Sequence, residues 1–410
     1  MIYENKTLCK IRTVTTFLIL EPNKETWEAE IHKASALCDH LTKRFIKKGY
    51  EVQSVRIVTN PFGEYLNTES YETAHKDLSY IRHLLGSMQG NGPRVRFAIG
   101  EAKSAYEIRL LPKLIRDFGD LCNACVNIAL DEDGVLINRL VDESAKAVRD
   151  ISSMTPRGEG NFNFTVNFNC EPLIPYFPAS YHKKELGNCF VIGLETPDLL
   201  AKVLKECNQV DTLKSNNERH SEYYHAMRSA LQFHISAINQ VVCDSQVNPE
   251  FKFSGFDSSA APSKDCLSMT QVYEDMGVEY FGASGTVEAS ALLTRVFKSI
   301  KGVDLVGFSG LMLALTEDRG LAEGSKNNNF DIRSLLTYSA VCGIGLDTVP
   351  IPGNTSVDKI SALMRDTGTL AYRLGKPLTV RLFPVPGLVA GDNTVFESDD
   401  LCNCAVLAVP

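Results

Sequence analysis

The sequence lacks the features by which membrane and nucleic-acid-binding proteins are recognised. It contains no run of about 18 apolar residues, and the apolar stretch 11–20 is short and is followed by no small-residue cleavage site, so it predicts a strand and not a signal peptide. The net charge is −8, and no window combines Lys/Arg runs with aromatic residues. We therefore expect a cytoplasmic protein with no nucleic-acid or membrane partner.

Paired metal-binding motifs are also missing. The 12 cysteines are scattered along the chain, and Cys122 and Cys125 form a single CxxC with no second pair to complete a zinc site. Two buried thiols are the favoured interpretation of this pair. No HExxH or EF-hand pattern occurs. We predict no cofactor and no tightly bound metal, while the Asp and Glu residues leave a divalent cation open.

What the chain does have is a globular composition, with 44% hydrophobic and 22% charged residues. Its 410 residues exceed the roughly 250–300 residues of a usual single core, so two domains or one large barrel are both possible. No linker, repeat or charge block divides it. We therefore expect one integrated α/β domain over 1–410, with an N-terminal half 1–195 and a site-rich C-terminal half 196–410.

Short β-rich runs alternate with amphipathic stretches over the first 150 residues, which indicates a βαβα arrangement. Expected strands are 11–20, 51–59, 94–99, 126–130 and, further along, 251–256. Apolar residues at three- and four-residue steps predict helices around 27–45, 80–85, 108–115, 135–151, 197–240, 266–276, 286–300, 330–341 and 356–373.

The clearest strand pattern is 161–170, where polar and apolar residues alternate. One face carries Phe162, Phe164, Val166, Phe168 and Cys170. The other face carries four asparagines and a threonine, for which we favour contact with solvent. The alternative is a wet cavity inside a barrel.

Several candidate site residues lie beside glycines near strand ends. Ser284, Gly285 and Thr286 precede a helix, and either hydroxyl could cap it; such a turn can bind an anion or be a simple capped turn. Asp257 follows an expected strand and could bind a metal, accept a proton or form an Asx turn. Cys342 leads through two glycines to Asp347, which suggests close backbone approach to a ligand or a neighbouring strand.

Further candidates come from both halves of the chain. His182 and Glu195 flank a probable strand, and a histidine is the natural acid/base group near neutral pH. Arg381 lies in a short strand before a rigid turn that leads to Asp392, and it could bind a carboxylate or phosphate or pair with a buried Asp.

Motifs spread in order along the chain resemble domain-of-unknown-function family 711, also called uncharacterised protein family 0210. They include Ser309 within a Gly-Phe-Ser-Gly run, followed by Glu317-Asp318. The full set is 60–62, 177–182, 191–195, 256–262, 281–286, 307–310, 317–318, 342–347, 351–355, 380–387 and 391–392.

The resemblance implies a barrel-like α/β fold, with two sets of parallel strands surrounded by helices, similar to the glycyl-radical enzymes. It also implies that the radical glycine is missing, because Pro384 stands at that position. The sequence departs from bacterial members at Ser284, where they have proline, and at 259–263, where their Leu-Ala-Pro-Thr-Pro reads Ser-Ala-Ala-Pro-Ser. These changes leave open a different substrate.

Two functional hypotheses follow. The first is a non-radical acid/base enzyme of lyase or isomerase type that acts on a small polar or carboxylate metabolite, in a homo-oligomer. Its catalytic candidates are Asp257, His182, Asp347, Cys342 and Glu195, and its substrate-binding candidates are Arg381, Ser284, Gly285, Thr286, Ser309 and Asp392. The second is a metabolite-binding regulatory protein without turnover.

Overall fold

The computed structural model describes residues 2–87, 95–210 and 216–410. Within these residues, nine strands form one sheet in the order β7-β6-β1-β2-β3-β4-β5-β9-β8. The strands are β1 (Lys10–Leu18), β2 (Val55–Thr59), β3 (Val95–Glu101), β4 (Asn123–Ile128), β5 (Phe164–Phe168), β6 (Cys189–Glu195), β7 (Lys252–Asp257), β8 (Gly345–Pro352) and β9 (Leu378–Val385).

The strands form two parallel sets that run in opposite directions. Strands β1 to β5 are parallel to one another. Strand β6 pairs antiparallel to β1 with β7 parallel to it, and β9 pairs antiparallel to β5 with β8 parallel to it. The two parallel strand sets expected from the resemblance are thus confirmed.

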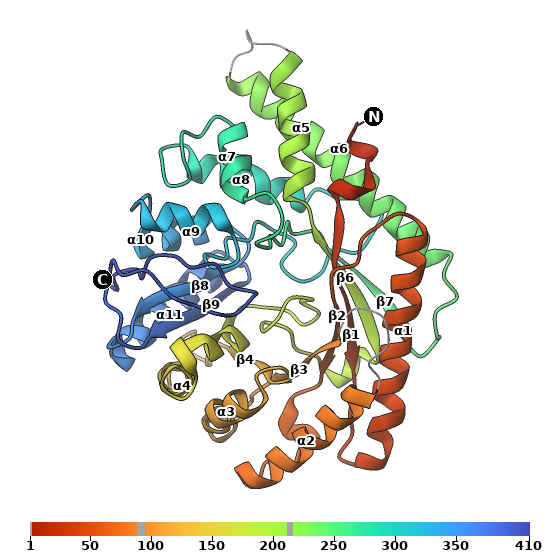
Figure 1. Cartoon of the computed structure of the whole chain (residues 1–410), viewed down its shortest axis with the longest axis vertical. Coiled ribbons are helices and arrows are strands. Elements are labelled where there is room, and N and C mark those ends of the chain that lie inside the picture. The colour runs from red at the N-terminus through yellow and green to blue at the C-terminus, as the bar shows by residue number, and fades with distance from the viewer. Residues whose placement is uncertain (1, 88–94, 211–215) are drawn as a thin grey trace.

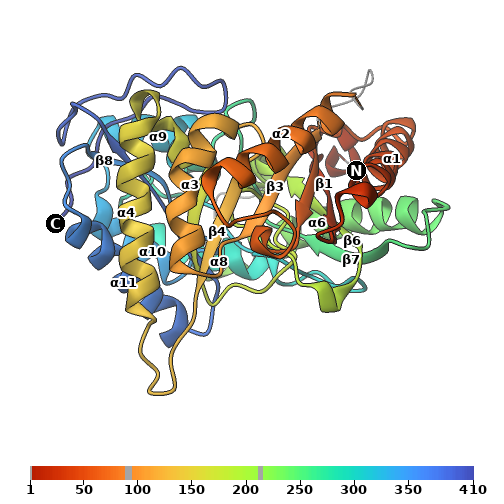
Figure 2. The same cartoon turned by 90° about the horizontal axis from the view of Figure 1, so that it is seen from below.

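The segment 305–314 spans the two free edges of this sheet. At one end, Leu305 forms a β-bridge with Phe256 of β7, and at the other end Ala314 forms a β-bridge with Asp347 of β8. The sheet therefore curves into a barrel-like shape. Helices lie around its outside (Figures 1 and 2).

The helices match the spacing of apolar residues. In α1 (Trp27–Lys47), buried side chains recur at three- and four-residue steps from Trp27 to Phe45. The others are α2 (Tyr71–Ser87), α3 (Ala105–Phe118), α4 (Asn138–Met154), α5 (Pro197–Val210), α6 (Asn216–Cys243), α7 (Met269–Asp275), α8 (Thr286–Phe297), α9 (Arg319–Lys326), α10 (Ile332–Ser339) and α11 (Val357–Arg373). Over the described ranges, none of the helices is both long and apolar enough to span a membrane.

Some expected elements differ from the structure. Residue 94 of the expected strand 94–99 and residues 211–215 of the expected helical stretch lie outside the described residues. Helix α9 was not predicted; the Asp318 side chain caps it by accepting bonds from the backbone N–H groups of Gly320 and Leu321 at 2.9 and 3.1 Å. Neither Ser284 nor Thr286 caps α8, because the N-cap is Gly285 with a φ of 99°.

The connection between β5 and β6 runs through the interior of the barrel (Figure 1). Thr15 Oγ1 in β1 donates to the carbonyl oxygen of Pro175 at 3.0 Å, and Asn167 Nδ2 in β5 donates to that of Ala179 at 3.0 Å. Strands far apart in the sheet therefore contact one loop. This occupied interior replaces the uniformly apolar core of a simple sheet.

The polar face of 161–170 faces this interior, so the expectation of solvent contact is wrong. Thr165 and Asn167 are 2% and 1% exposed. Their partners are the carbonyl of Val380 for Thr165, and Asn127 as well as Ala179 for Asn167. The asparagines satisfy buried polar groups of the loop and of neighbouring strands, which a solvent-facing row would not need to do.

Glycine is required at one point of the closing segment. Gly307 has a φ of 64°, and a Cβ there would lie 2.2 Å from Asp257 Oδ2. Gly302 also has a positive φ, 76°, but a Cβ there would meet no atom within 4 Å.

We predict that Gly307→Ala destabilises the protein more than Gly302→Ala. Both variants should lose about 1–2 kcal/mol from the left-handed backbone. The Gly307 variant should lose about 1–3 kcal/mol more from overpacking against Asp257. Urea unfolding of both variants measures the difference, and equal losses would contradict the assigned contact.

Candidate functional site

A cavity of about 370 Å³ lies inside the barrel, lined by residues near the start of β1 to β5 and in the first half of β8 and β9. Its walls come from both strand sets, from the interior loop and from the closing segment. Arg12, Arg56 and Arg96 line one side, and Glu317, Asp347 and Arg381 line another. The volume lies at the small end of the range for ligand pockets.

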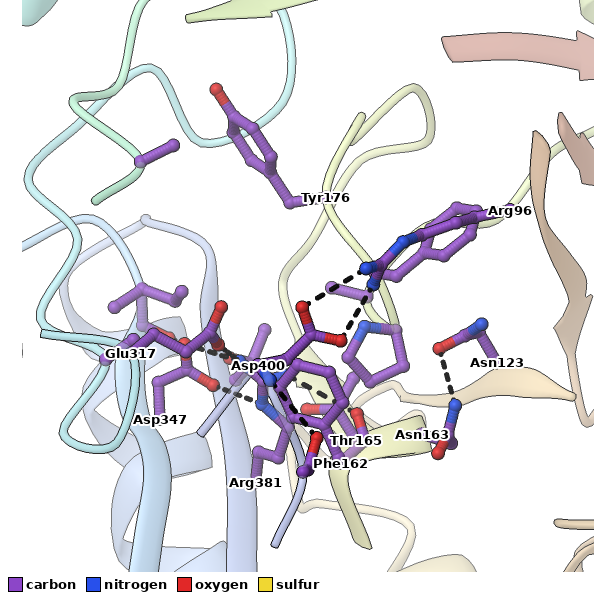
Figure 3. Close-up of a pocket in the computed structure, with 18 of the residues that line it drawn as sticks. Arg96, Asn123, Phe162, Asn163, Thr165, Tyr176, Glu317, Asp347, Arg381 and Asp400 are labelled. Carbon is purple, nitrogen blue, oxygen red and sulfur yellow. Dashed lines mark hydrogen bonds and ion pairs between the residues drawn. The ribbon is translucent and has the colours of Figure 1, made fainter. Parts of the chain in front are cut away.

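Arg381 of β9 holds two carboxylates in this cavity (Figure 3). Its Nε and Nη2 donate to Oδ1 and Oδ2 of Asp347 at 2.6 and 3.0 Å, a two-pronged bond. Its Nη2 also donates to Glu317 Oε1 at 2.5 Å. The Arg381 guanidinium lies over the Phe162 ring, 5.0 Å from the ring centroid. Arg381 therefore forms a buried ion pair with an Asp, which is one of the two alternatives that the sequence allowed.

One guanidinium cannot neutralise two carboxylates, and this affects Glu317. Burial raises the pKa of Glu317, and the Asp347 charge raises it further, while Arg381 opposes both effects. Glu317 is the carboxyl of this group that can hold a proton at a higher pH than an ordinary Glu. Such a group suits proton transfer inside a cavity.

The opposite wall is basic. Arg56 is 7% exposed, and its Nη1 donates to the carbonyl oxygen of Pro175 at 3.3 Å. Burial lowers the pKa of Arg56 to about 9, and the charges of Arg12 and Arg96 lower it as well. Arg96 differs, because it makes a two-pronged bond to Asp400 at 3.1 and 3.2 Å (Figure 3).

The structure brings two of the predicted site residues, Asp347 and Arg381, into the cavity. The other predicted residues do not line it, so the expectation that they form one cluster is wrong. The glycines and loops beside these residues contact other parts of the chain and not the cavity.

Asp257 and Ser309 close the barrel. Asp257 Oδ1 accepts bonds from the Ser259 Oγ and N–H and from the Ser309 N–H at 2.6, 3.0 and 3.1 Å, and Oδ2 accepts one from the Phe308 N–H at 2.8 Å. Burial raises the pKa of Asp257 to about 6, against the effect of these bonds. The bond from the Ser259 N–H forms an Asx turn, which is one of the alternatives that the sequence allowed for Asp257.

His182 and Glu195 lie at opposite ends of β6. The His182 ring packs on Phe17, which pairs with Cys189 at the start of β6. Six residues of strand, about 20 Å, separate Cys189 from Glu195. Glu195 accepts a bond from Gln53 Nε2 at 2.7 Å and forms an ion pair with Lys10 at 3.4 Å. The two side chains therefore cannot act on one substrate atom.

Cys342 is buried three residues after the end of α10, and the two glycines that follow it lie against backbone. A Cβ at Gly343 would lie 2.9 Å from the Cα of Gly310, and one at Gly345 would lie 2.4 Å from the carbonyl oxygen of Thr379. The Cys342 Sγ accepts a bond from the Gly345 N–H at 3.5 Å. Of the two alternatives given for 342–347, the structure has the close approach to a neighbouring strand.

Ser284, Gly285, Thr286 and Asp392 also lie away from the cavity lining. Ser284 and Gly285 are exposed at the start of α8, and Thr286 Oγ1 donates to the carbonyl of Ala283 at 2.7 Å. Asp392 accepts a bond from the Val389 N–H at 2.8 Å within its own turn. Thr286 and Asp392 thus stabilise local turns.

Glu317, Arg12 and Arg56 were not among the sequence candidates. A signal for the arginines exists, because β1, β2 and β3 each carry one among their first three residues. Arg56 and Arg96 are direct register partners. For Glu317 the signal is its place in the Glu317-Asp318 motif.

Cysteine and metal predictions concern other parts of the chain. Cys122 and Cys125 are buried free thiols, as favoured from the sequence. Across the described residues, no three His, Cys, Asp or Glu side chains gather closely enough to hold a metal ion.

We predict that His182 makes the protein sensitive to acid. Burial lowers its pKa from 6.5 to about 4. A depressed folded-state pKa contributes stability that is present above pH 6.5 and is lost as the pH falls through 4, here up to about 3 kcal/mol.

Replacing His182 with Phe keeps a ring against Phe17 but removes the titrating group. The wild type should therefore lose up to about 3 kcal/mol relative to His182→Phe between pH 6.5 and pH 4. Urea midpoints at a series of pH values measure this difference. Parallel profiles for the two proteins would contradict the prediction.

Comparison with known proteins agrees with the resemblance in the motifs. The family model described as Uncharacterised ACR (DUF711) matches residues 1–397. A UPF0210 protein of Carboxydothermus hydrogenoformans is 25% identical over 89% of this chain and 81% of the relative. One of Pyrobaculum arsenaticum is 26% identical over 93% of this chain and 85% of the relative.

Among solved structures, similarity is found to the anaerobic ribonucleotide reductase from Thermotoga maritima with citrate in the active site. The TM-score is 0.44 at 9% identity, over 90% of this chain and 80% of the other. The family match covers nearly the whole sequence, and the chain therefore belongs to the DUF711 (UPF0210) family of uncharacterised proteins.

Proposed function

We propose that the protein is an enzyme that performs non-radical acid/base chemistry, of lyase or isomerase type, on a small polar or carboxylate metabolite held in the cavity. The observation that carries this proposal is that Glu317 shares one guanidinium with Asp347 inside a cavity of metabolite size. A carboxyl whose pKa is raised by burial in such a place is a common acid/base group of enzymes.

The residues have distinct roles in this proposal. Glu317 in its ionised form accepts a proton from a carbon of the substrate, and the neutral acid then returns that proton to the substrate or to a leaving group. Arg381 positions Glu317 through its bond at 2.5 Å, and the two-pronged bond to Asp347 fixes the guanidinium itself. Arg381 and Asp347 are positioning residues.

A radical route is not part of the proposal. Pro384, which the resemblance aligns with the radical glycine, lies in β9 and pairs with Ile351 of β8. Proline carries no backbone N–H and no second α-hydrogen, so it cannot replace a glycine as the site of the radical. The proton-transfer route needs only groups that already line the cavity.

Turnover separates this proposal from a metabolite-binding regulator. We predict that incubation of the wild type with metabolite pools in D₂O yields product or deuterium-labelled substrate, and that Glu317→Gln slows this by about 10²–10⁴-fold. Mass spectrometry detects both changes.

The matched control is Glu323→Gln, an exposed residue of α9 that pairs with Lys326. This variant should keep the wild-type rate. Retention of a metabolite without product or label would favour the regulator and reject the enzyme. The cytoplasmic location and the homo-oligomeric state expected from the sequence remain proposals, and gel filtration of the full chain tests the second.

A further inference from the structure

We propose that Arg12 and Arg56 together form an anion seat that binds the phosphate group of a small phosphorylated metabolite. The inference rests on the proposed function only in taking the same cavity as the ligand site. It adds the chemical class of the ligand and the residues that recognise it.

Strand register brings the arginines to one wall. Arg56 of β2 pairs with Thr15 of β1 on one side and with Arg96 of β3 on the other. Arg12 lies at a shift in the β1–β6 register between Ile11 and Thr13, and such a bulge turns a side chain away from its regular direction. Arg12, Arg56 and Arg96 all line the cavity.

Within the part of the chain that the structure describes, only one of these three arginines forms an ion pair with a carboxylate. Arg96 is matched by Asp400. Among residues 2–87, 95–210 and 216–410, no carboxylate lies within ion-pair distance of Arg12 or Arg56. Arg12 Nη1 donates to the amide oxygen of Gln53 at 3.2 Å, which carries no charge.

The missing ion-pair partner costs the most free energy at Arg56. Its side chain is buried, its Nε has no hydrogen-bond partner, and the Phe177 ring covers its face at 4.9 Å. Burying a charge without a partner is strongly unfavourable, and native proteins usually pair it. An anion in the cavity would supply both the missing charge and a missing acceptor.

Phosphate matches this seat better than a carboxylate does. A phosphate monoester carries a charge of roughly −1.5 to −2 at neutral pH, with three acceptor oxygens, so it can satisfy two guanidinium groups at once. A carboxylate carries a single charge and would leave one arginine unbalanced. Glu317 on the opposite wall repels an anion, which keeps the phosphate at the Arg12 and Arg56 side.

The test measures thermal stability of the full chain with inorganic phosphate as the probe, at constant ionic strength. Phosphate should raise the Tm of the wild type by a few degrees at concentrations well above Kd. Arg56→Met should abolish that rise. In the absence of phosphate the same variant should be as stable as the wild type or more so, because it removes an unpaired buried charge.

A second variant and a control keep the test decisive. Arg12 is partly exposed, so Arg12→Met should fold normally and weaken the response at least severalfold. Arg109→Met, on the surface of α3 where Arg109 pairs with Glu143, should respond like the wild type. An equal response in all proteins, or none in the wild type, would overturn the anion seat.

Acetate and malonate, used in place of phosphate, distinguish the two kinds of oxyanion. A rise in Tm as large as that caused by phosphate would overturn the choice of phosphate. The two proposals can also fail separately. Glu317→Gln should retain the phosphate response, so loss of that response in Arg56→Met stands even when no turnover is found.

Discussion

The rest of the cavity depends on the hydrogen bonds that the carboxylate of Asp257 accepts. It receives four hydrogen bonds, two of them from the backbone of the segment that spans the free edges of the sheet. At the other edge, that segment packs backbone against backbone, with Gly310 against Gly343. Phe308, Met312 and Ala314 of the segment line the cavity, and Glu317 follows directly. The position of Glu317 is therefore set by anchoring contacts at Asp257 and Gly343 that lie outside the cavity lining.

The cavity divides its charges between two walls, and this division would fix how a ligand lies. Arg381 meets two carboxylates, whereas Arg12 and Arg56 meet none within ion-pair distance in the described chain. Aromatic rings cover the faces of Arg381 and Arg56 at 5.0 and 4.9 Å. The Phe177 ring covers one face of the Arg56 guanidinium, and the Arg56 Nε remains free to donate to a ligand. In the proposed reaction, the negative group of a ligand would lie against β1 and β2, and the part that exchanges a proton would face Glu317.

The sequence predicts the elements of this fold better than it predicts the site. Alternation and helical spacing locate most strands and most helices, because those patterns depend on one face of each element being buried. Strand β8, which begins at a glycine and contains two prolines, was not predicted. The polar face of β5 was misassigned, since a half-buried sheet and a barrel filled by a loop give the same alternation. Asp347 and Arg381 were predicted because glycine and proline flank them.

The residues that were missed depend on contacts across long separations. Glu317 and Arg381 are 64 residues apart, and Arg56 and Arg96 meet only through strand register. The turn at 284–286 was a candidate for anion binding because of its small residues, yet Gly282 just before it packs on backbone, where a Cβ would lie 2.1 Å from the carbonyl oxygen of Asn329. In parallel sheets, ligands usually bind at the carboxyl ends of the strands. Here the two sets run in opposite directions, so each end of the barrel is the carboxyl end of one set. Strand direction therefore cannot select between the two ends, and the candidate site is identified instead by a cavity that charged side chains from both halves of the chain line.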